Sequence, residues 1–472
     1  MIAYHTLHQE ETMDKEKTLN QILQEYKQTR PRSQDLFEQA CRYQIDGGSH
    51  NLRLFSPFPF YDQTSKGSKV TDVDGFTYID FWQGHFANIL GHNPSCVLDS
   101  LQEMFSHGQG LIAGFPGNLQ QALAKLILDR TGQEKIRFTT SGALATMYAV
   151  MLSRTFTGKE LVIKAGGGWH GSQPYLLKGV STYDHGLHSL ESAGLPPETD
   201  SRIVMTRFND LNQLRETFRE YGTKTACLIV EPFIGAGGFL SAREDYLQEI
   251  RELCHEYNVL LIMDEVISGF RFHAGALSTL YGITPDLTVF GKSIGGGMPV
   301  SALVGREDIL GLCSSKTPFH KRVKFEGGTF SAHPACMQAG ITFISYLIDH
   351  EDDIYPRIGQ LGDMVRHGLQ EILRKRGFHV QSTGGGLPGN AGSSLIGLHF
   401  LTDKTSQVNS PEDVFNPEVC DQQLRDRIFK LAMLLEGYHI FHGYGALSFA
   451  HTEEEVHGSL EAAERIARKW SQ

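Results

Sequence analysis

The stretch that decides the fold is Val259–Pro299, which reads VLLIMDEVISGFRFHAGALSTLYGITPDLTVFGKSIGGGMP. It begins with the continuous apolar run Val259 to Met263, and this run ends on two carboxylates, Asp264 and Glu265. A short run with no polar alternation is typical of a strand buried on both faces, as in a parallel sheet. We therefore predict a buried central strand whose carboxyl end carries an acid.

A second short apolar run, Leu287 to Phe290, stops at Gly291-Lys292 and passes into a glycine-rich turn. A lysine in such a turn is usually a solvated surface group. Here, however, Asp264 and Lys292 would both lie at the edge where open α/β sheets bind ligands. A lysine amine forms a Schiff base with a carbonyl cofactor, and pyridoxal phosphate also needs an acid beside its pyridinium nitrogen. The pair supplies both parts, so we assign Lys292 and Asp264 as catalytic residues.

Three segments resemble a known family and occur in the family's order: MDEVISGFR at 263–271, TPDLTVFGKSIGGGMPVSALVGR at 284–306 and EGGTFSAHP at 326–334. They are similar to the class III (ornithine-type) aminotransferases, and in particular to the branch of glutamate semialdehyde aminomutase. The similarity extends from about Gly47 to the C-terminus. It implies pyridoxal 5'-phosphate as cofactor and the PLP-dependent transferase fold type I. This is an α/β fold with a large domain around a mainly parallel sheet and a smaller α+β domain.

The resemblance and the change of pattern along the chain predict three parts. Residues 1–85 form an N-terminal arm and strands of the small domain, residues 86–330 the large cofactor-binding domain, and residues 331–472 the C-terminal small α+β domain. At 472 residues the chain is long for a single domain, which agrees with this division.

A phosphate site is predicted where KIRFTTSGALATMYAV (135–150) passes from a strand into a helix. Ser141, Gly142 and Ala143 form the turn, and the unpaired N–H groups at the start of a helix bind anions. The resembled family usually carries Asn-Ser-Gly-Thr-Glu-Ala here, whereas Ala143 and Leu144 replace the threonine and the glutamate. The missing hydroxyl removes one hydrogen bond, worth about 1 kcal/mol. We therefore predict that the cofactor is bound more weakly or is held by different contacts.

The resemblance implies four further residues around the cofactor. Trp169 takes the place of the aromatic residue that stacks on the pyridine ring, and Val266 packs on the opposite face. Glu231 corresponds to a supporting group near the cofactor, although a carboxylate at a strand end is equally consistent with a plain salt bridge. Thr329 corresponds to a threonine that reaches the phosphate of the neighbouring subunit's cofactor, so a homodimer with shared active sites is implied. His170, next to Trp169, is interpreted as structural.

Arg53, in GGSHNLRLFSPFPF (47–60), is the predicted substrate-binding residue. The resemblance implies an arginine at this place that binds the substrate carboxylate, and a planar guanidinium holds a carboxylate through two parallel hydrogen bonds. The alternative is an arginine that only ties the N-terminal arm to the body of the protein. Trp82 and His85 are candidate walls of the same pocket.

The composition limits the partners. The formal net charge of −11 argues against nonspecific binding to nucleic acid, which needs a basic surface. No apolar run approaches the roughly 20 residues that span a bilayer, and the polar N-terminus does not resemble a signal peptide. Seven scattered cysteines without a CxxC pair indicate a reducing compartment and no zinc site. We expect a cytoplasmic enzyme that acts on small-molecule amines and carbonyls, with no metal, nucleic-acid or membrane partner.

Two reactions fit this cofactor. A transaminase moves an amino group between an amine or amino acid and a keto acid or aldehyde through the Lys292 Schiff base, and the lysine also moves protons. The resemblance to the glutamate semialdehyde aminomutase branch raises a second possibility, an intramolecular aminomutase reaction. Aminomutases of that branch carry a glutamate in the segment that matches HIFHGYGALSFAHT (439–452), where this chain has Gly443-Tyr444, so a transaminase is favoured. A third reading, a catalytically weakened scaffold that only binds the cofactor, disagrees with the retention of both Asp264 and Lys292.

Overall fold

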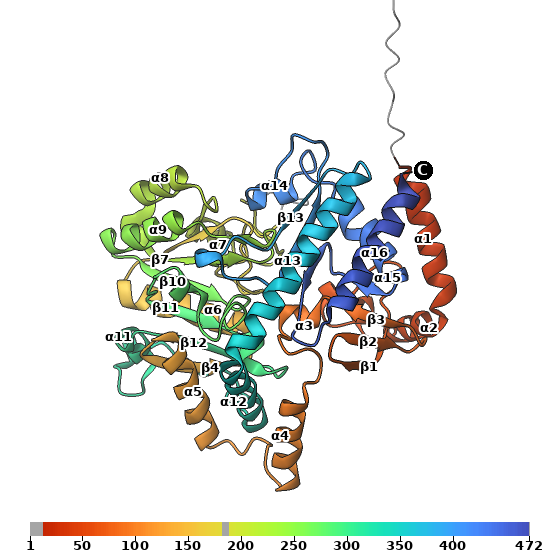
Figure 1. The fold of residues 1–472 in the computed structure, drawn as a ribbon. Helices are drawn as coiled ribbons and strands as arrows, with labels where there is room; N and C mark the ends of the chain where they lie inside the picture. Colours follow the sequence, from red (N-terminus) through yellow and green to blue (C-terminus); the bar gives the residue numbers. More distant parts are fainter. Residues whose placement is uncertain (1–12, 182–187, 472) are drawn as a thin grey trace, which may run out of the picture.

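A seven-stranded sheet lies at the centre of the computed structural model, which describes residues 13–181 and 188–471 (Figure 1). The first twelve residues of the predicted N-terminal arm lie outside the described residues. The strand order is β4-β12-β11-β10-β7-β5-β6, and every neighbouring pair except the two that involve β12 is parallel. The strands are β4 (Lys135–Thr139), β5 (Leu161–Ala165), β6 (Ile203–Thr206), β7 (Thr225–Val230), β10 (Leu260–Glu265), β11 (Leu287–Phe290) and β12 (Ser301–Gly305).

The central strand β10 is buried along its whole length because helices cover both faces of the sheet. Leu260 belongs to the apolar cluster formed with α6 (Gly142–Thr157) on one face. The next residue, Leu261, belongs to the cluster formed with α8 (Leu211–Tyr221) and α9 (Glu244–Glu256) on the other face. Successive residues of a strand point to opposite faces. The sequence of a strand that is covered on both faces is therefore a continuous apolar run.

A further group of helices packs beside β4 and β11 and supports the turn that follows β11. α5 (Asn118–Thr131) and α12 (Pro334–Asp349) bury the aromatic ring of Phe290 in a common cluster, and α4 (Ser95–Ser106) packs on α12 (Figure 1). Gly340 of α12 lies so close to this turn that an added Cβ would be 2.6 Å from the carbonyl oxygen of residue 294. The helix layer thus fixes the backbone just after the strand end.

The remaining sheets combine both ends of the chain. β15 pairs in parallel with β3, so segments about 360 residues apart share one sheet of order β1-β2-β3-β15. A three-stranded antiparallel sheet, in the order β13-β14-β16, and a two-stranded one, β8-β9, complete the set. The strands are β1 (Asp62–Lys66), β2 (Lys69–Asp72), β3 (Thr77–Asp80), β8 (Phe233–Ile234), β9 (Leu240–Ser241), β13 (Val380–Thr383), β14 (Leu395–Phe400), β15 (Tyr438–His439) and β16 (Tyr444–Ala446).

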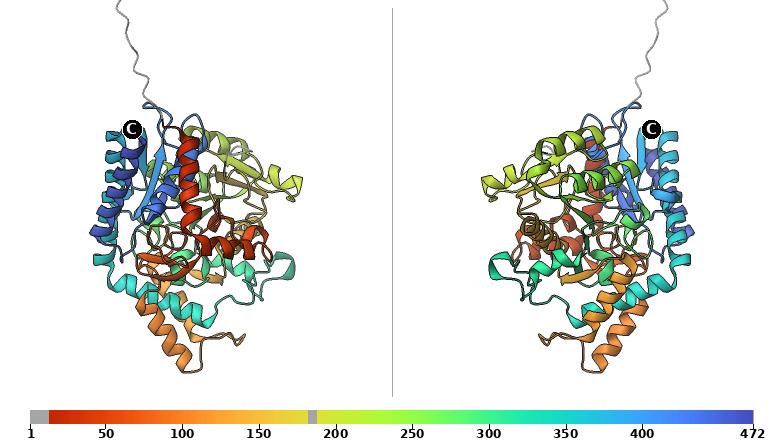
Figure 2. Two further views of the ribbon diagram at one scale, coloured as in Figure 1. Left: turned by 90° about the vertical axis from the view of Figure 1, so that its right-hand side faces the viewer. Right: turned by 90° about the vertical axis from the view of Figure 1, so that its left-hand side faces the viewer.

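Helices from the two chain ends share one apolar core with strands β3, β13 and β14. Figures 1 and 2 show α1 and α16 on the same side of the molecule. No helix within the described ranges is long and apolar enough to cross a membrane. The remaining helices are α1 (Lys15–Thr29), α2 (Pro31–Ala40), α3 (Gln83–Phe86), α7 (Pro197–Arg202), α10 (Leu277–Leu280), α11 (Glu307–Leu310), α13 (Glu351–Lys375), α14 (Pro411–Phe415), α15 (Lys430–Leu435), α16 (Glu453–Trp470) and a π-helical segment, Leu424–Phe429.

Candidate active site

The carboxyl ends of β10 and β11 open into a cavity of about 1020 Å³. The two strands are parallel neighbours, with Asp264 opposite Val289, so the residues at their carboxyl ends meet at one edge of the sheet. Both Asp264 and Lys292 line the cavity. The structure therefore brings together the acid and the amine that the sequence placed at two separate strand ends.

Lys292 occupies the first position of the turn after β11, with φ +46°. This left-handed conformation is unfavourable for a residue with a Cβ, and strain of this kind concentrates at functional sites. Burial lowers the pKa of the Lys292 amine, although the negative charges of Asp264 and Glu231 oppose the effect. A lowered pKa increases the fraction of neutral amine, which is the form that attacks a carbonyl.

Asp264 is buried and held in one orientation. Its Oδ2 accepts a hydrogen bond from Nδ1 of His170 at 2.7 Å, and its Oδ1 accepts one from the backbone N–H of Val266 at 3.1 Å. Burial lowers the pKa of His170, although Asp264 opposes this, so we assign a neutral imidazole with its proton on Nδ1. His170 thus orients the carboxylate. The sequence carries no local sign of this contact, because the two residues are 94 positions apart.

Glu231 supports the loop that carries Trp169. Its Oε1 accepts from the backbone N–H of Trp169 and its Oε2 from the backbone N–H of Gly235, each at 2.9 Å. Burial, together with the charge of Asp264, raises the pKa of Glu231. The Trp169 side chain is 39% exposed and lines the cavity, so a flat aromatic face is available there.

The N-terminus of α6 forms another wall of the cavity. Ser141 is the N-cap residue, and its Oγ accepts from the backbone N–H of Leu144 at 3.4 Å. The first N–H groups of a helix have no partner within it, and here they belong to the cavity-lining residues Gly142 and Ala143. An added Cβ at Gly142 would lie 3.0 Å from Cγ2 of Val266, so glycine lets the valine pack directly against the helix start. The arrangement suits an anion.

Two predicted residues lie away from this inner group. Arg53 lines the outer part of the cavity, where its Nε donates to Nε2 of His85 at 3.4 Å. Thr329 is exposed and is not among the cavity-lining residues of the described chain. A single chain therefore does not bring Thr329 to the site.

Comparison with known proteins agrees with this geometry. Residues 55–388 match the family Aminotransferase class-III. The chain belongs to the class III aminotransferases. It is 32% identical over 440 residues to the glutamate-1-semialdehyde 2,1-aminomutase of Methanobrevibacter smithii, an alignment that covers 92% of this chain and 97% of that protein.

Two solved structures extend the comparison of this class III aminotransferase. An omega-transaminase from Sphaerobacter thermophilus superposes with a TM-score of 0.81 at 29% identity, covering 92% of this chain and 98% of the other. A beta-phenylalanine aminotransferase from Variovorax paradoxus superposes with a TM-score of 0.83 at 27% identity, covering 96% and 98%. The comparisons confirm the predicted family, fold type I, the cofactor pyridoxal 5'-phosphate and the enzyme class, a transaminase or an aminomutase. The donor set is chemically suited to that cofactor, since amine, carboxylate, free N–H groups and an aromatic face share one cavity.

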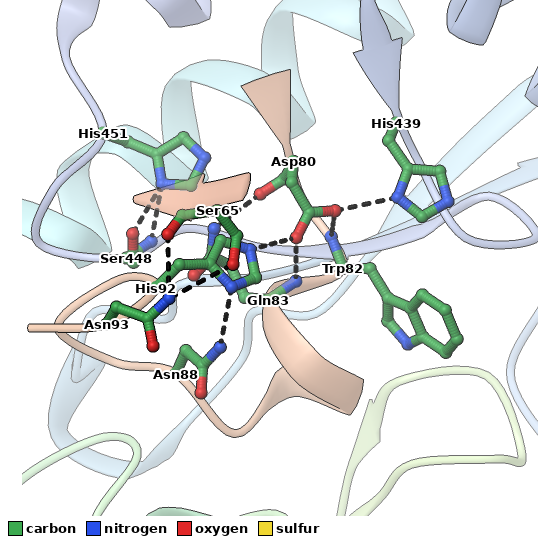
Figure 3. A network of polar contacts seen from close by, with 10 residues as sticks. All are labelled: Ser65, Asp80, Trp82, Gln83, Asn88, His92, Asn93, His439, Ser448 and His451. Atoms are coloured by element: carbon green, nitrogen blue, oxygen red, sulfur yellow. Dashed lines mark hydrogen bonds and ion pairs between the residues drawn. The ribbon is translucent and has the colours of Figure 1, made fainter. Parts of the chain in front are cut away.

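One buried group of this aminotransferase was not predicted. Asp80, at the end of β3, lies between His92 and His439 (Figure 3). Its carboxylate accepts from Nε2 of His92 at 2.7 Å and from Nδ1 of His439 at 2.8 Å. Burial opposes ionisation of Asp80, but these hydrogen bonds outweigh it and hold its pKa well below the usual range. Strand alternation places Asp80 on the same buried face as Tyr78, which is the one sequence signal that marks it.

Proposed function

We propose that this protein is an aminotransferase in which Lys292 is the catalytic amine and Asp264 the partner of the cofactor's ring nitrogen. The observation that carries the proposal is the single cavity that holds the buried amine of Lys292, the oriented carboxylate of Asp264 and the start of α6. Lys292 would hold the carbonyl carbon of pyridoxal 5'-phosphate. When bound, the cofactor supplies an electron sink for the substrate's amine-bearing carbon.

The other cavity residues have distinct roles in this proposal. Ser141, Gly142 and Ala143 would hold the phosphate through N–H groups and the N-cap hydroxyl. Trp169 and Val266 would cover the two faces of the ring, and Glu231 would fix Trp169 through its backbone. Once its amine is free, Lys292 would move a proton at the reacting carbon.

Arg53 is the proposed receptor for a substrate carboxylate. Its side chain is exposed at the cavity, and it forms no ion pair with any residue of the described ranges. A guanidinium that is not already paired with a protein acid is available to bind a carboxylate. The same feature disfavours the alternative of an arginine that only anchors the N-terminal arm.

Intermolecular transfer is favoured over an aminomutase reaction by the segment around residues 443 and 444. Tyr444 is buried and lies outside the set of cavity-lining residues, and its hydroxyl is 3.4 Å from Nη1 of Arg425. This position therefore offers neither a carboxylate nor a contact with the cavity. The donor and acceptor we propose are an amine or amino acid and a separate keto acid or aldehyde.

Isotope transfer separates the two reactions. The holoenzyme is incubated with a 15N-labelled donor and an unlabelled carbonyl acceptor, and the products are analysed by mass spectrometry. A transaminase places 15N in the molecule derived from the acceptor. Retention of all label in the carbon skeleton of the donor, with the amine on a neighbouring carbon, would establish the aminomutase instead.

A homodimer with shared sites completes the proposal. Six large apolar residues of the described ranges are at least 60% exposed, and four of them lie on two segments, residues 111–115 and 319–330: Leu111 at 78%, Phe115 at 86%, Phe319 at 86% and Phe330 at 60%. Exposed apolar side chains on neighbouring segments mark association surfaces. Thr329, adjacent to Phe330, would thus enter the site of the second subunit.

Hybrid dimers test the sharing. A Lys292→Ala chain is co-assembled with a Thr329→Ala chain, and the purified heterodimer is assayed. If Thr329 acts across the interface, one of the two sites contains both substitutions and the other contains neither, so activity reappears at about half the wild-type value. If the heterodimer is no more active than the two parent homodimers, Thr329 does not act in the partner's site.

Two further assignments accompany this proposal. We infer the division into residues 1–85, 86–330 and 331–472, which the pairing of β3 with β15 supports, because it joins the N-terminal strands to the C-terminal part. We also infer a cytoplasmic location, supported by seven cysteines that are all free thiols.

A further inference from the structure

The segment Gln83–Phe86, labelled α3 in Figure 1, forms a left-handed turn, and its residues Gly84 and His85 line the cavity. Its four consecutive residues have φ values of +46°, +62°, +62° and +66°, and only the second is glycine. Residues with a Cβ visit this region as single positions and almost never in succession, because Cβ comes too close to the following carbonyl oxygen. Such a conformation persists only where the surrounding structure enforces it.

Both ends of the turn are anchored by buried charged groups. At the start, the carboxylate of Asp80 accepts from the backbone N–H groups of Trp82 at 3.0 Å and Gln83 at 2.9 Å (Figure 3). At the end, the buried guanidinium of Arg271 donates to the carbonyl oxygen of Phe86. The histidines that hold Asp80 therefore also stabilise the strained turn.

The turn presents His85 to the cavity beside Arg53. The imidazole of His85 packs against the rings of Trp82, at 4.3 Å between centroids, and His50, at 4.8 Å. Its Nε2 lies 3.4 Å from Nε of Arg53. Because an arginine only donates hydrogen bonds, Nε2 must be the acceptor, and the imidazole is neutral. Burial and the positive charges of His50, Arg53 and Lys292 lower the pKa of His85 to about 3, so it stays an acceptor at neutral pH.

We propose that His85 is a positioning residue that fixes the guanidinium of Arg53 for the substrate carboxylate, an inference that rests on the proposed role of Arg53. Engagement of Nε by His85 leaves the two Nη groups to bind a carboxylate oxygen pair. The Arg53 side chain is exposed and has no other side-chain hydrogen bond within the described residues. Without His85, ordering the long side chain would therefore weaken binding.

Two variants separate this role from packing. His85→Phe keeps an aromatic ring against Trp82 and His50 but removes the acceptor, whereas His85→Gln keeps an acceptor at a similar reach. Neither new side chain is β-branched, so both meet a comparable backbone cost in the left-handed turn. Binding of pentanoate, and of pentan-1-ol as the uncharged analogue, is measured by calorimetry on the holoenzyme. Thermal unfolding and the cofactor spectrum verify that each variant is folded and loaded.

The expected result is selective for the carboxylate. His85→Phe weakens pentanoate binding about tenfold, which corresponds to about 1.4 kcal/mol, and leaves pentan-1-ol binding unchanged. His85→Gln restores pentanoate binding to within about twofold of wild type. Unchanged pentanoate binding in His85→Phe, or equal weakening of both ligands, overturns the inference.

Arg53→Ala distinguishes failure of this inference from failure of the proposed function. In the Arg53→Ala background, adding His85→Phe should have no further effect on pentanoate, because the group that His85 positions is absent. A further loss in that background shows that His85 acts by another route. If Arg53→Ala alone leaves pentanoate binding unchanged, the proposed carboxylate site is wrong, whatever the His85 variants show.

Discussion

Replacement of Ala143 by threonine should tighten the hold on the cofactor phosphate. Ala143 lies at the second position of α6, lines the cavity, and stands where the family usually carries a threonine. Gly171 leaves no space on one side of the Ala143 side chain, because a Cβ added at Gly171 would lie 2.5 Å from Cβ of Ala143. A hydroxyl at residue 143 is therefore expected to turn to the open, cavity side, next to the N–H groups that we assign to the phosphate.

The magnitude follows from the hydrogen bond that is gained. A typical hydrogen bond contributes about 1 kcal/mol, and one to a charged group such as a phosphate contributes about 1.5–3 kcal/mol. The lower value applies to a partly exposed site and corresponds to roughly a tenfold lower dissociation constant. Ala143→Val is the matched control, since valine has the shape of threonine without its hydroxyl. Any crowding against Gly171 is common to both variants and cancels in the comparison.

The assay uses pyridoxamine 5'-phosphate, which makes no covalent bond to Lys292. Its affinity therefore measures noncovalent binding of the cofactor alone. Its dissociation constant is measured by equilibrium dialysis for wild type, Ala143→Thr and Ala143→Val. We expect the threonine variant to bind about tenfold more tightly than the valine variant. Equal constants for the two variants would mean that the phosphate is held elsewhere than at the start of α6.

Three other outcomes are expected. Arg53→Ala should raise KM for carboxylate substrates by about tenfold or more with little change in kcat, and unchanged steady-state kinetics would remove Arg53 from the site. His170→Phe removes the 2.7 Å hydrogen bond to Asp264 and should lower kcat about tenfold to a hundredfold, whereas His170→Asn should lose less; equal losses would argue against an orienting role. Burial lowers the pKa of Lys164 from 10.5 to about 7. Between about pH 7 and pH 10.5 the Lys164 amine is therefore protonated in the unfolded chain and neutral in the folded chain. The free energy of unfolding of the wild type should therefore rise with pH across this range, by up to about 1.4 kcal/mol per pH unit. In Lys164→Met the melting temperature should rise less steeply with pH. Parallel plots of melting temperature against pH for the two proteins would contradict this prediction.

The central strands were predictable because their signal is local. A strand covered by helices on both faces needs apolar residues at every position, and the run before Asp264 has them. The antiparallel direction of β12 was not predictable in the same way, since Ser301–Gly305 is short, buried and mostly apolar, like the parallel strands of the sheet. Strand direction is set by the connections between elements, which an apolar run does not encode.

The parts of the site that escaped prediction depend on contacts between distant segments. His170 meets Asp264 across 94 residues, and Asp80 meets His439 across 359, so neither pair leaves a spacing pattern. The left-handed turn Gln83–Phe86 has a single glycine and no repeated turn signal, because anchors outside the turn impose its conformation. Each of these features is a product of the folded arrangement.

The proposed function depends most directly on which lysine binds the cofactor. The protein is incubated with pyridoxal 5'-phosphate, reduced with sodium borohydride and digested, and the modified peptide is identified by mass spectrometry. We predict stoichiometric modification of Lys292, and none in a Lys292→Ala variant treated in parallel. Stoichiometric modification of another lysine, or persistence of the modification in Lys292→Ala, would contradict the central claim.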